Sequence, residues 1–187
     1  MNDIKILDDF LPTYLQDFLE EGFYNGNLKL NLIKKTLPNI KDNDYFDDEQ
    51  LECWIKLHNN LNLDYSHYYL LPLQIGCLNL GVQFNLENLF RAKLNITLNS
   101  TSSPSKINPP HIDGDHGRDY FVAIYYINDS DGDTIIYEGK DRNNLKIIKT
   151  ITPKKGRLIL MGGERYHSSS HPSNTKKRIV MNYNVFC

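Results

Sequence analysis

The second half of the chain alternates apolar and polar residues, and this period of two limits the fold more than any other feature. In residues 91–99, Ala92, Leu94, Ile96 and Leu98 alternate with polar residues, so an extended chain would have one buried face. Further segments rich in Val, Ile, Tyr or Phe follow at short intervals, bounded by Gly, Pro, Asn or Asp; they are residues 120–128, 133–137, 145–151, 157–161 and 178–186. Many short strands without intervening helices predict an antiparallel sandwich or jelly roll.

Residues 1–90 have a different pattern, and we expect a helical support region there. A run that starts at Pro12 has apolar residues at helical spacing, and Asp47 or Asp48 could cap a second helix over residues 49–61. Residues 26–44, rich in Asn and Lys, indicate a loop between them. Residues 65–80 are apolar, and we predict a helix there although Pro72 interrupts it. A chain of 187 residues then forms a single domain, with residues 1–90 supporting a β core of residues 91–187.

Composition excludes several classes of protein. The formal net charge of −2 provides no general attraction to nucleic acid, which is therefore not an expected partner. The 3 cysteines form no C-x-x-C pair, which argues against a disulfide framework or a thiolate zinc site. The first residues are polar and acidic, unlike a signal peptide, and no apolar run approaches the roughly 20 residues of a membrane span. We expect a cytoplasmic protein without a membrane partner, and the sequence does not indicate its oligomeric state.

A possible metal site lies inside the β region. In His111-x-Asp113, an extended chain would project both side chains from one side, so that both could reach one cation. His167 follows a predicted strand, and neighbouring antiparallel strands could bring it close. Two imidazoles and one carboxylate form the facial triad of non-haem Fe(II) oxygenases, which leaves positions open for a cosubstrate and dioxygen.

Two other histidines compete for the third ligand position. His116 could complete a local H-x-D-x-x-H cluster, although so short a loop would place it with difficulty. His171 lies in the sequence SSSHPSN, which is typical of an exposed loop.

Arg178 is the candidate anchor for a dicarboxylate cosubstrate, because its planar fork of donors suits a carboxylate. In residues 178–186, alternation places Ile179, Met181, Tyr183 and Val185 on one apolar face that helices could cover. Arg178, Val180, Asn182 and Asn184 then share the opposite face, which would line a cavity. Lys177 would point away from that cavity.

Residues 91–187 resemble the Fe(II)- and 2-oxoglutarate-dependent dioxygenases, in particular the prolyl-4-hydroxylase-like group. The resemblance is carried, in the family's order, by His111-x-Asp113, AIYYIN, DGDT, GRLILMGGERYHS and KRIVMNYNVF. It implies a double-stranded β-helix, a jelly roll, as the catalytic core, with Fe(II) held by His111, Asp113 and His167. It also implies that Arg178 pairs with the far carboxylate of 2-oxoglutarate, assisted by Tyr126 and Thr134.

The implied reaction couples O2 and the oxidative decarboxylation of 2-oxoglutarate, which releases succinate and CO2, to hydroxylation of a C–H bond. Asp113 favours hydroxylation, because halogenating relatives lack the carboxylate ligand. The expected substrate is a peptide, with a prolyl peptide among the candidates, or a small amino-acid-like molecule. Two departures from the family pattern stand out: Asp131-Gly132-Asp133-Thr134 replaces a frequent Gly-Gly-Glu-Thr, and Asn184 occupies a position that is often aromatic in prolyl hydroxylases. The second departure weakens the transfer of prolyl specificity.

Two other functions remain open. Nucleobase-directed 2-oxoglutarate dioxygenases usually carry a second arginine where Asn184 stands here. A non-catalytic, metal- or sugar-binding cupin-like module would keep the β fold and close its metal site with a fourth protein ligand. Residues 98–108 and the N-terminal half are expected to select the substrate.

Overall fold

The computed structural model describes residues 3–25, 30–33, 50–57, 60–61, 68–99, 107–114 and 117–187, and in these ranges the chain is mainly β. Its helices are α1 (Thr13–Asn25) and α3 (Leu71–Asn79), with short 3-10 turns η1 (Leu86–Asn88) and η2 (Arg142–Asn144). The strands are β1 (Lys5–Leu7), β2 (Asn31–Ile33), β3 (Gln50–Leu57), β4 (Asn60–Leu61), β5 (Leu89–Leu98), β6 (Tyr120–Tyr126), β7 (Thr134–Glu138), β8 (Lys146–Ile151), β9 (Leu158–Gly162), β10 (His167–Ser169) and β11 (Lys177–Phe186).

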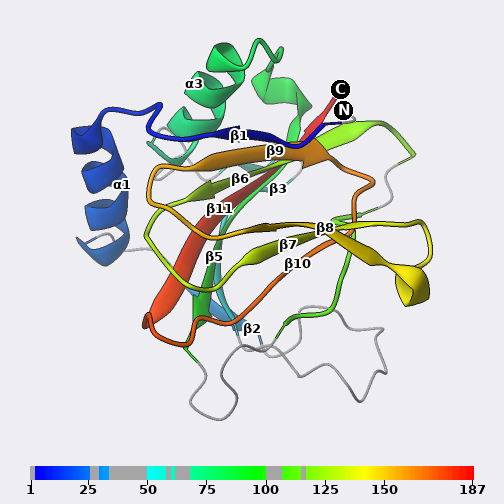
Figure 1. Ribbon diagram of the computed structural model, residues 1–187. Coiled ribbons are helices and arrows are strands. Elements are labelled where there is room, and N and C mark those ends of the chain that lie inside the picture. Colours follow the sequence, from blue (N-terminus) through cyan, green and yellow to red (C-terminus); the bar gives the residue numbers. More distant parts are fainter. Residues whose placement is uncertain are drawn as a thin grey trace.

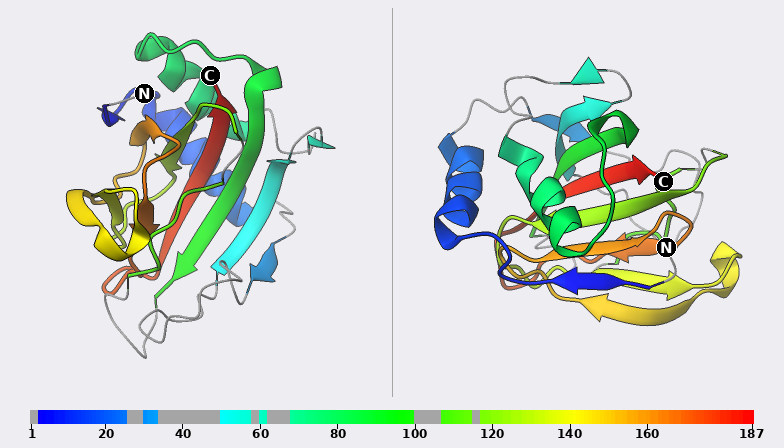
Figure 2. Two further views of the ribbon diagram at one scale, coloured as in Figure 1. Left: turned by 90° about the vertical axis from the view of Figure 1, so that its right-hand side faces the viewer. Right: turned by 90° about the horizontal axis from the view of Figure 1, so that it is seen from above.

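The strands form two antiparallel sheets (Figure 1). The larger sheet has 8 strands in the order β1-β9-β6-β11-β5-β3-β2, with β4 beside β3. The smaller sheet has 3 strands in the order β10-β7-β8. The smaller sheet lies nearer to β11 than to β3 (Figure 2, left). Strand β3 continues the larger sheet beyond β5.

The strand predictions for the second half of the chain are confirmed. Strands β5, β6, β7, β8, β9 and β11 each begin and end within two residues of a predicted segment. The helix predicted after Pro12 is confirmed as α1. The helix predicted over residues 65–80 is present as α3, and Pro72 lies in its first turn rather than interrupting it, because the first turn needs no intrahelical N–H bond there. None of the helices in the described ranges is long and apolar enough to span a membrane.

The helix predicted over residues 49–61 is wrong, because this segment contains β3 and β4. β3 pairs with β5, with Gln50 opposite Thr97 and Cys53 opposite Leu94. Cys53 and Ile55 are buried in the core, so hydrogen bonding to β5 and burial of one face override the helical propensity. The predicted loop 26–44 likewise contains the short strand β2, which pairs with β3. Asp47 and Asp48 lie outside the described residues.

The larger sheet is covered on both faces, which corrects the expectation that β5 buries only one. On one face, Leu19 of α1 and Leu73 of α3 pack against the apolar row that includes Met181. On the other face, a second apolar cluster that includes Ile124 and Val180 lies between the two sheets. Lys93 and Thr97 of β5 are 8% and 1% exposed on this inner face. The inner face of β5 and β11 is the wall on which the site is built.

Candidate active site

The structure brings together the three side chains that the sequence indicated as metal ligands. His111 and His167 face each other across an antiparallel bridge, in which each backbone N–H donates to the other's carbonyl over 2.9 Å. Asp113 Oδ1 lies 3.7 Å from His111 Nε2, and Asp113 Oδ2 lies 3.8 Å from His167 Nε2. The three ligand atoms lie within 4.8 Å of one another, close enough to share one ion.

Both imidazoles have their Nε2 atoms available for a metal. Each Nδ1 lies 3.1 Å from a backbone carbonyl, that of Pro109 for His111 and that of Arg165 for His167. Because a carbonyl only accepts, each Nδ1 carries a proton, and this tautomer directs the Nε2 lone pair of the neutral ring towards a metal. Burial, followed by the neighbouring His167, lowers the pKa of His111 to about 4, so this ring is neutral at physiological pH.

The buried Nε2 of His167 is the observation that tests whether a metal fits. In the part of the chain that the structure describes, this atom has no hydrogen-bond partner. A buried acceptor without a partner is costly, and a cation shared with Asp113 and His111 would satisfy it. The donor set of two imidazoles and one carboxylate therefore fits a ferrous ion.

Asp113 is held by residues that the sequence analysis did not assign to the site. Its Oδ2 accepts hydrogen bonds from Asn184 Nδ2 over 2.8 Å and from Asn182 Nδ2 over 3.2 Å, and Arg91 Nη1 lies 3.3 Å from its Oδ1. Burial alone would raise the pKa of Asp113, but Arg91, the two imidazoles and the Asn184 bond outweigh it and hold the pKa far below its ordinary value. The carboxylate is therefore ionised and ready to bind a cation.

Alternation along β11 predicted that Asn182 and Asn184 lie on the cavity face. It could not predict that both would contact Asp113. Arg91 reaches Asp113 from β5, and no motif in the sequence marks this contact.

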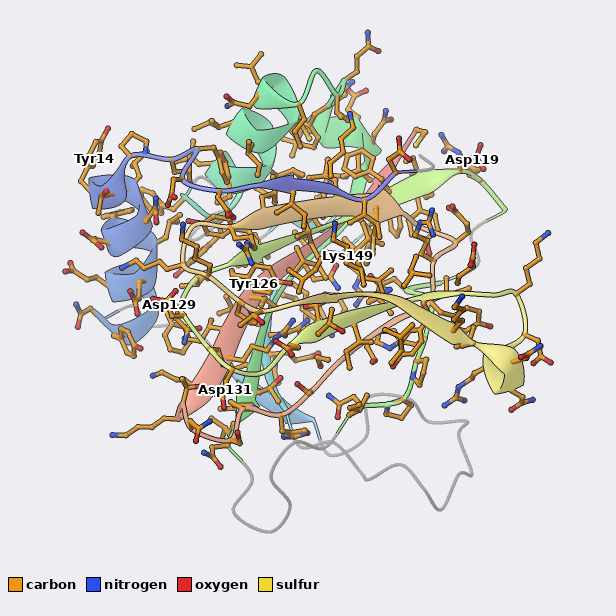
Figure 3. The ribbon with its side chains drawn as sticks, in the orientation of Figure 1. Tyr14, Asp119, Tyr126, Asp129, Asp131 and Lys149 are labelled. Atoms are coloured by element: carbon orange, nitrogen blue, oxygen red, sulfur yellow. The ribbon has the colours of Figure 1, made fainter. Side chains whose placement is uncertain are left out.

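Arg178, Thr134 and Tyr126 meet in a second group in the same inner layer. Arg178 Nη2 and the Tyr126 hydroxyl each donate to Thr134 Oγ1 over 2.7 Å. The guanidinium carbon also lies 5.6 Å from the centroid of the Tyr126 ring, which lies between the two sheets (Figure 3). All three residues are at most 4% exposed. The Thr134 oxygen thus fixes the guanidinium, and Tyr125 belongs to the opposite core, as strand alternation requires.

A cavity of about 220 Å³ joins the two groups, since His111, Asp113, His167, Thr134 and Arg178 all line it. Half of its other lining side chains come from β5 and β11; among them are Arg91, Lys93, Asn95, Val180 and Asn182. The cavity can hold a small ligand that contacts the His-Asp-His cluster and Arg178 at once.

The competing residues lie elsewhere. His171 Nδ1 lies 3.2 Å from the Leu98 carbonyl and its Nε2 lies 3.2 Å from Asn108 Oδ1. His171 is only 9% exposed, so its interpretation as an exposed loop residue is wrong. The contacts with Leu98 and Asn108 bury it. Lys177 points to the opposite face, with Nζ 4.0 Å from the centroid of the Tyr24 ring. His116 lies outside the described residues.

Comparison with known proteins identifies the class of fold. No family model and no curated protein matches the sequence. Solved structures do match, and the chain has the fold of the 2-oxoglutarate- and Fe(II)-dependent oxygenases, a class that includes prolyl hydroxylases.

Three neighbours illustrate the range of this class. A prolyl hydroxylase from Trichoplax adhaerens, in complex with a hypoxia inducible factor oxygen degradation domain peptide fragment, is 16% identical with a TM-score of 0.65, covering 100% of this chain and 84% of its own. An oxidoreductase of the 2OG-Fe(II) oxygenase family from Burkholderia pseudomallei is 12% identical with a TM-score of 0.64 and coverages of 97% and 84%. The epimerase SnoN, in complex with Fe3+, alpha ketoglutarate and nogalamycin RO, is 10% identical with a TM-score of 0.64 and coverages of 99% and 79%.

Proposed function

We propose that this protein is an Fe(II)- and 2-oxoglutarate-dependent dioxygenase. It hydroxylates a C–H bond of a peptidyl or amino-acid-like substrate and releases succinate and CO2. The observation that carries the proposal is that one small cavity contains both the His111-Asp113-His167 cluster and the buried Arg178. In this proposal the two facing sheets are the double-stranded β-helix of such enzymes.

His111, Asp113 and His167 would hold the iron. When bound, Fe(II) with 2-oxoglutarate supplies the activation of O2 and the oxidative decarboxylation. Three protein ligands leave the remaining positions open for the cosubstrate and O2. The backbone bridge between His111 and His167 fixes two of these ligands relative to each other, and Asn184 and Asn182 orient the third.

Arg178 would pair with the far carboxylate of 2-oxoglutarate. Its guanidinium is nearly inaccessible to solvent, and a charged hydrogen bond is stronger in such a setting than in water. Thr134 keeps the guanidinium in place, and the Tyr126 hydroxyl completes the group from β6. The cosubstrate would therefore bind with both of its ends held.

The other two functions have less support. A closed structural metal site needs a fourth protein ligand, and in the described ranges only His111, Asp113 and His167 gather as a possible metal cluster. A nucleobase-directed enzyme would be expected to carry an arginine at position 184, where Asn184 instead donates to Asp113. The neighbours include one protein with a bound peptide and one with a small molecule, so fold alone does not choose between these substrate sizes.

The proposal is tested by succinate formation from 2-oxoglutarate with Fe(II) and O2, together with the absorption band that appears when 2-oxoglutarate is added to the anaerobic Fe(II) protein. We expect His111→Ala and Asp113→Ala to lose both signals. His171→Ala is the matched control, because His171 is a histidine outside the cluster, and it should keep them. Absence of the band in the unmodified protein, or turnover that persists in Asp113→Ala, would exclude the proposed function.

A further inference from the structure

Apart from the contact of Arg91 with Asp113, a second polar wall of the cavity has no role in the proposed chemistry. It consists of Arg91, Lys93, Asn95 and Thr97, which are alternate residues of β5 and all line the cavity. In the β5–β11 pairing, Arg91 lies opposite Asn184 and Lys93 lies opposite Asn182. The wall therefore begins beside the His-Asp-His cluster and runs along the sheet.

Lys93 is held in this wall by the neighbouring strand β3. Its Nζ lies 2.8 Å from Glu52 Oε2, and the side chains of both residues are at most 10% exposed. Trp54 Nε1 donates to the other oxygen of the same carboxylate over 2.9 Å. Nζ of Lys93 also lies 5.2 Å from the centroid of the Trp54 ring. Glu52 uses one of the three ammonium donors, so Lys93 is fixed in place with donor capacity remaining.

The charged side chains around the cavity carry an excess of one positive charge. The charged groups described there are the cations Arg91, Lys93 and Arg178 and the anions Asp113 and Glu52, three against two. A ferrous ion and the 2-oxoglutarate dianion cancel each other, so the excess remains when both are bound. Burial first, and the charge of Arg91 second, lower the pKa of Lys93, so keeping this ammonium charged beside Arg91 has an electrostatic cost. An additional anion between them would relieve that cost.

The same wall also carries amide oxygens without partners. Asn95 Oδ1 and Asn182 Oδ1 are buried and accept no hydrogen bond from any described residue. Asn182 lies opposite Lys93 in the sheet, and Asn95 is the next residue on the same face. Acceptors beside a cation pair match a molecule that presents N–H donors near a carboxylate.

We propose that Arg91 and Lys93 bind the carboxylate of the substrate, while Asn95 and Asn182 accept hydrogen bonds from its nitrogen. The substrate class is then a free amino acid or a comparably small amino-acid-like molecule with its own carboxylate, rather than an internal segment of a protein. This inference rests on the proposed function and identifies the substrate class of the same cavity.

The test uses the full chain loaded anaerobically with Fe(II) and 2-oxoglutarate, which is titrated calorimetrically with the common L-amino acids and their C-terminal amides. At least one acid should bind, and its amide should bind about tenfold or more weakly, the usual effect of one charge-assisted hydrogen bond. Lys93→Met should abolish this preference and leave 2-oxoglutarate binding unchanged. Lys93→Arg, which keeps the charge, should retain part of it.

Two controls separate the possible failures. Lys177→Met removes a lysine from the opposite face of the same sheet and should keep the preference. If Lys93→Met does not fold because Glu52 is left buried without its partner, Glu52→Gln with Lys93→Met removes both charges. The excess of one positive charge then remains, but the ammonium contact with the substrate carboxylate is gone, so the preference should still be lost. Failure of 2-oxoglutarate to bind the unmodified protein would exclude the proposed function itself. Binding of 2-oxoglutarate without any preference for acids over amides, or a loss of 2-oxoglutarate affinity in Lys93→Met, would overturn only the present inference.

Discussion

Asn184 Nδ2 donates a 2.8 Å hydrogen bond to Oδ2 of Asp113, so Asn184 orients the carboxylate of the His111-Asp113-His167 cluster. The same oxygen lies 3.8 Å from His167 Nε2. Mutation of a residue that orients a metal ligand typically lowers the metal affinity or the activity by roughly 10- to 100-fold. Asn184 is therefore assigned as a positioning residue rather than a ligand.

Removal of this hydrogen bond should weaken metal binding. We expect Asn184→Ala to lower the affinity for Co(II), a redox-stable substitute for Fe(II), by roughly 10- to 100-fold in calorimetric titration. Asn143→Ala, in the exposed turn η2, is the control and should leave the affinity unchanged. Equal Co(II) affinity in Asn184→Ala and the unmodified protein would contradict the positioning role.

The hydroxyl of Thr134 should be necessary for tight binding of 2-oxoglutarate. Thr134→Val preserves the shape of the side chain but removes the acceptor shared by Arg178 and Tyr126. We expect the KM for 2-oxoglutarate to rise by about tenfold while Co(II) affinity remains the same. Thr134→Ser restores the hydroxyl and should recover most of the loss. A KM that does not change in Thr134→Val would show that the guanidinium is held without this contact.

Gly132 allows the chain to pass close to Arg178. A Cβ at this position would lie 2.8 Å from the Ser170 carbonyl oxygen and 3.1 Å from Arg178 Cδ. Gly132→Ala should therefore displace Arg178, weaken 2-oxoglutarate binding and lower the free energy of unfolding by about 1–3 kcal/mol. Gly22→Ala in α1 is the matched control, since its Cβ would make an ordinary 3.5 Å contact with the Tyr69 hydroxyl. It should be neutral or slightly stabilising, and a similar result for both variants would refute the steric argument.

Asp131 should make the fold sensitive to acid. Its carboxylate accepts backbone N–H bonds from Ser173, Asn174 and Thr175, just before β11, and hydroxyl bonds from Ser173 and Thr175 (Figure 3). Partial burial would raise the pKa of Asp131, but these hydrogen bonds dominate and lower it well below its usual value. Because the lowered pKa belongs to the folded state, the stabilisation is complete above the unfolded value of about 3.9 and is lost as the pH falls below it.

The expected measurement is the free energy of unfolding by urea at pH 7 and at pH 3. At pH 7, Asp131→Asn should lower the free energy of unfolding by on the order of 1–3 kcal/mol. The partial exposure of the carboxylate favours the lower end of this range, because solvent screens its interactions. The difference should shrink towards pH 3, because there the unfolded chain takes up a proton at Asp131 while the folded protein keeps this carboxylate ionised. Asp141→Asn, which removes a carboxylate that caps the exposed turn η2, should show little difference at either pH. A difference for Asp131→Asn that stays constant with pH would rule out the ionised carboxylate as its cause.

Alternation along single strands was sufficient to predict β5, β6, β7, β8, β9 and β11 and the face of β11 that carries Arg178. This face could be read locally, because successive side chains of a strand point to opposite sides whatever the strand pairs with. The spacing of His111 and Asp113 was informative for the same reason.

Contacts between distant strands could be decided only by the tertiary structure. The segment of β3 was predicted to be helical because its own residues contain no sign that it pairs with β5. The contacts of Asn184 and Arg91 with Asp113, and the position of Lys93 against Glu52, depend on the register between strands far apart in the sequence. Residue types and their period therefore determined the strands and the candidate ligands of this protein. The pairing register decided which polar side chains share the cavity. This register is set by the hydrogen bonds and the burial of all the strands in the sheet together, so it cannot be read from one strand.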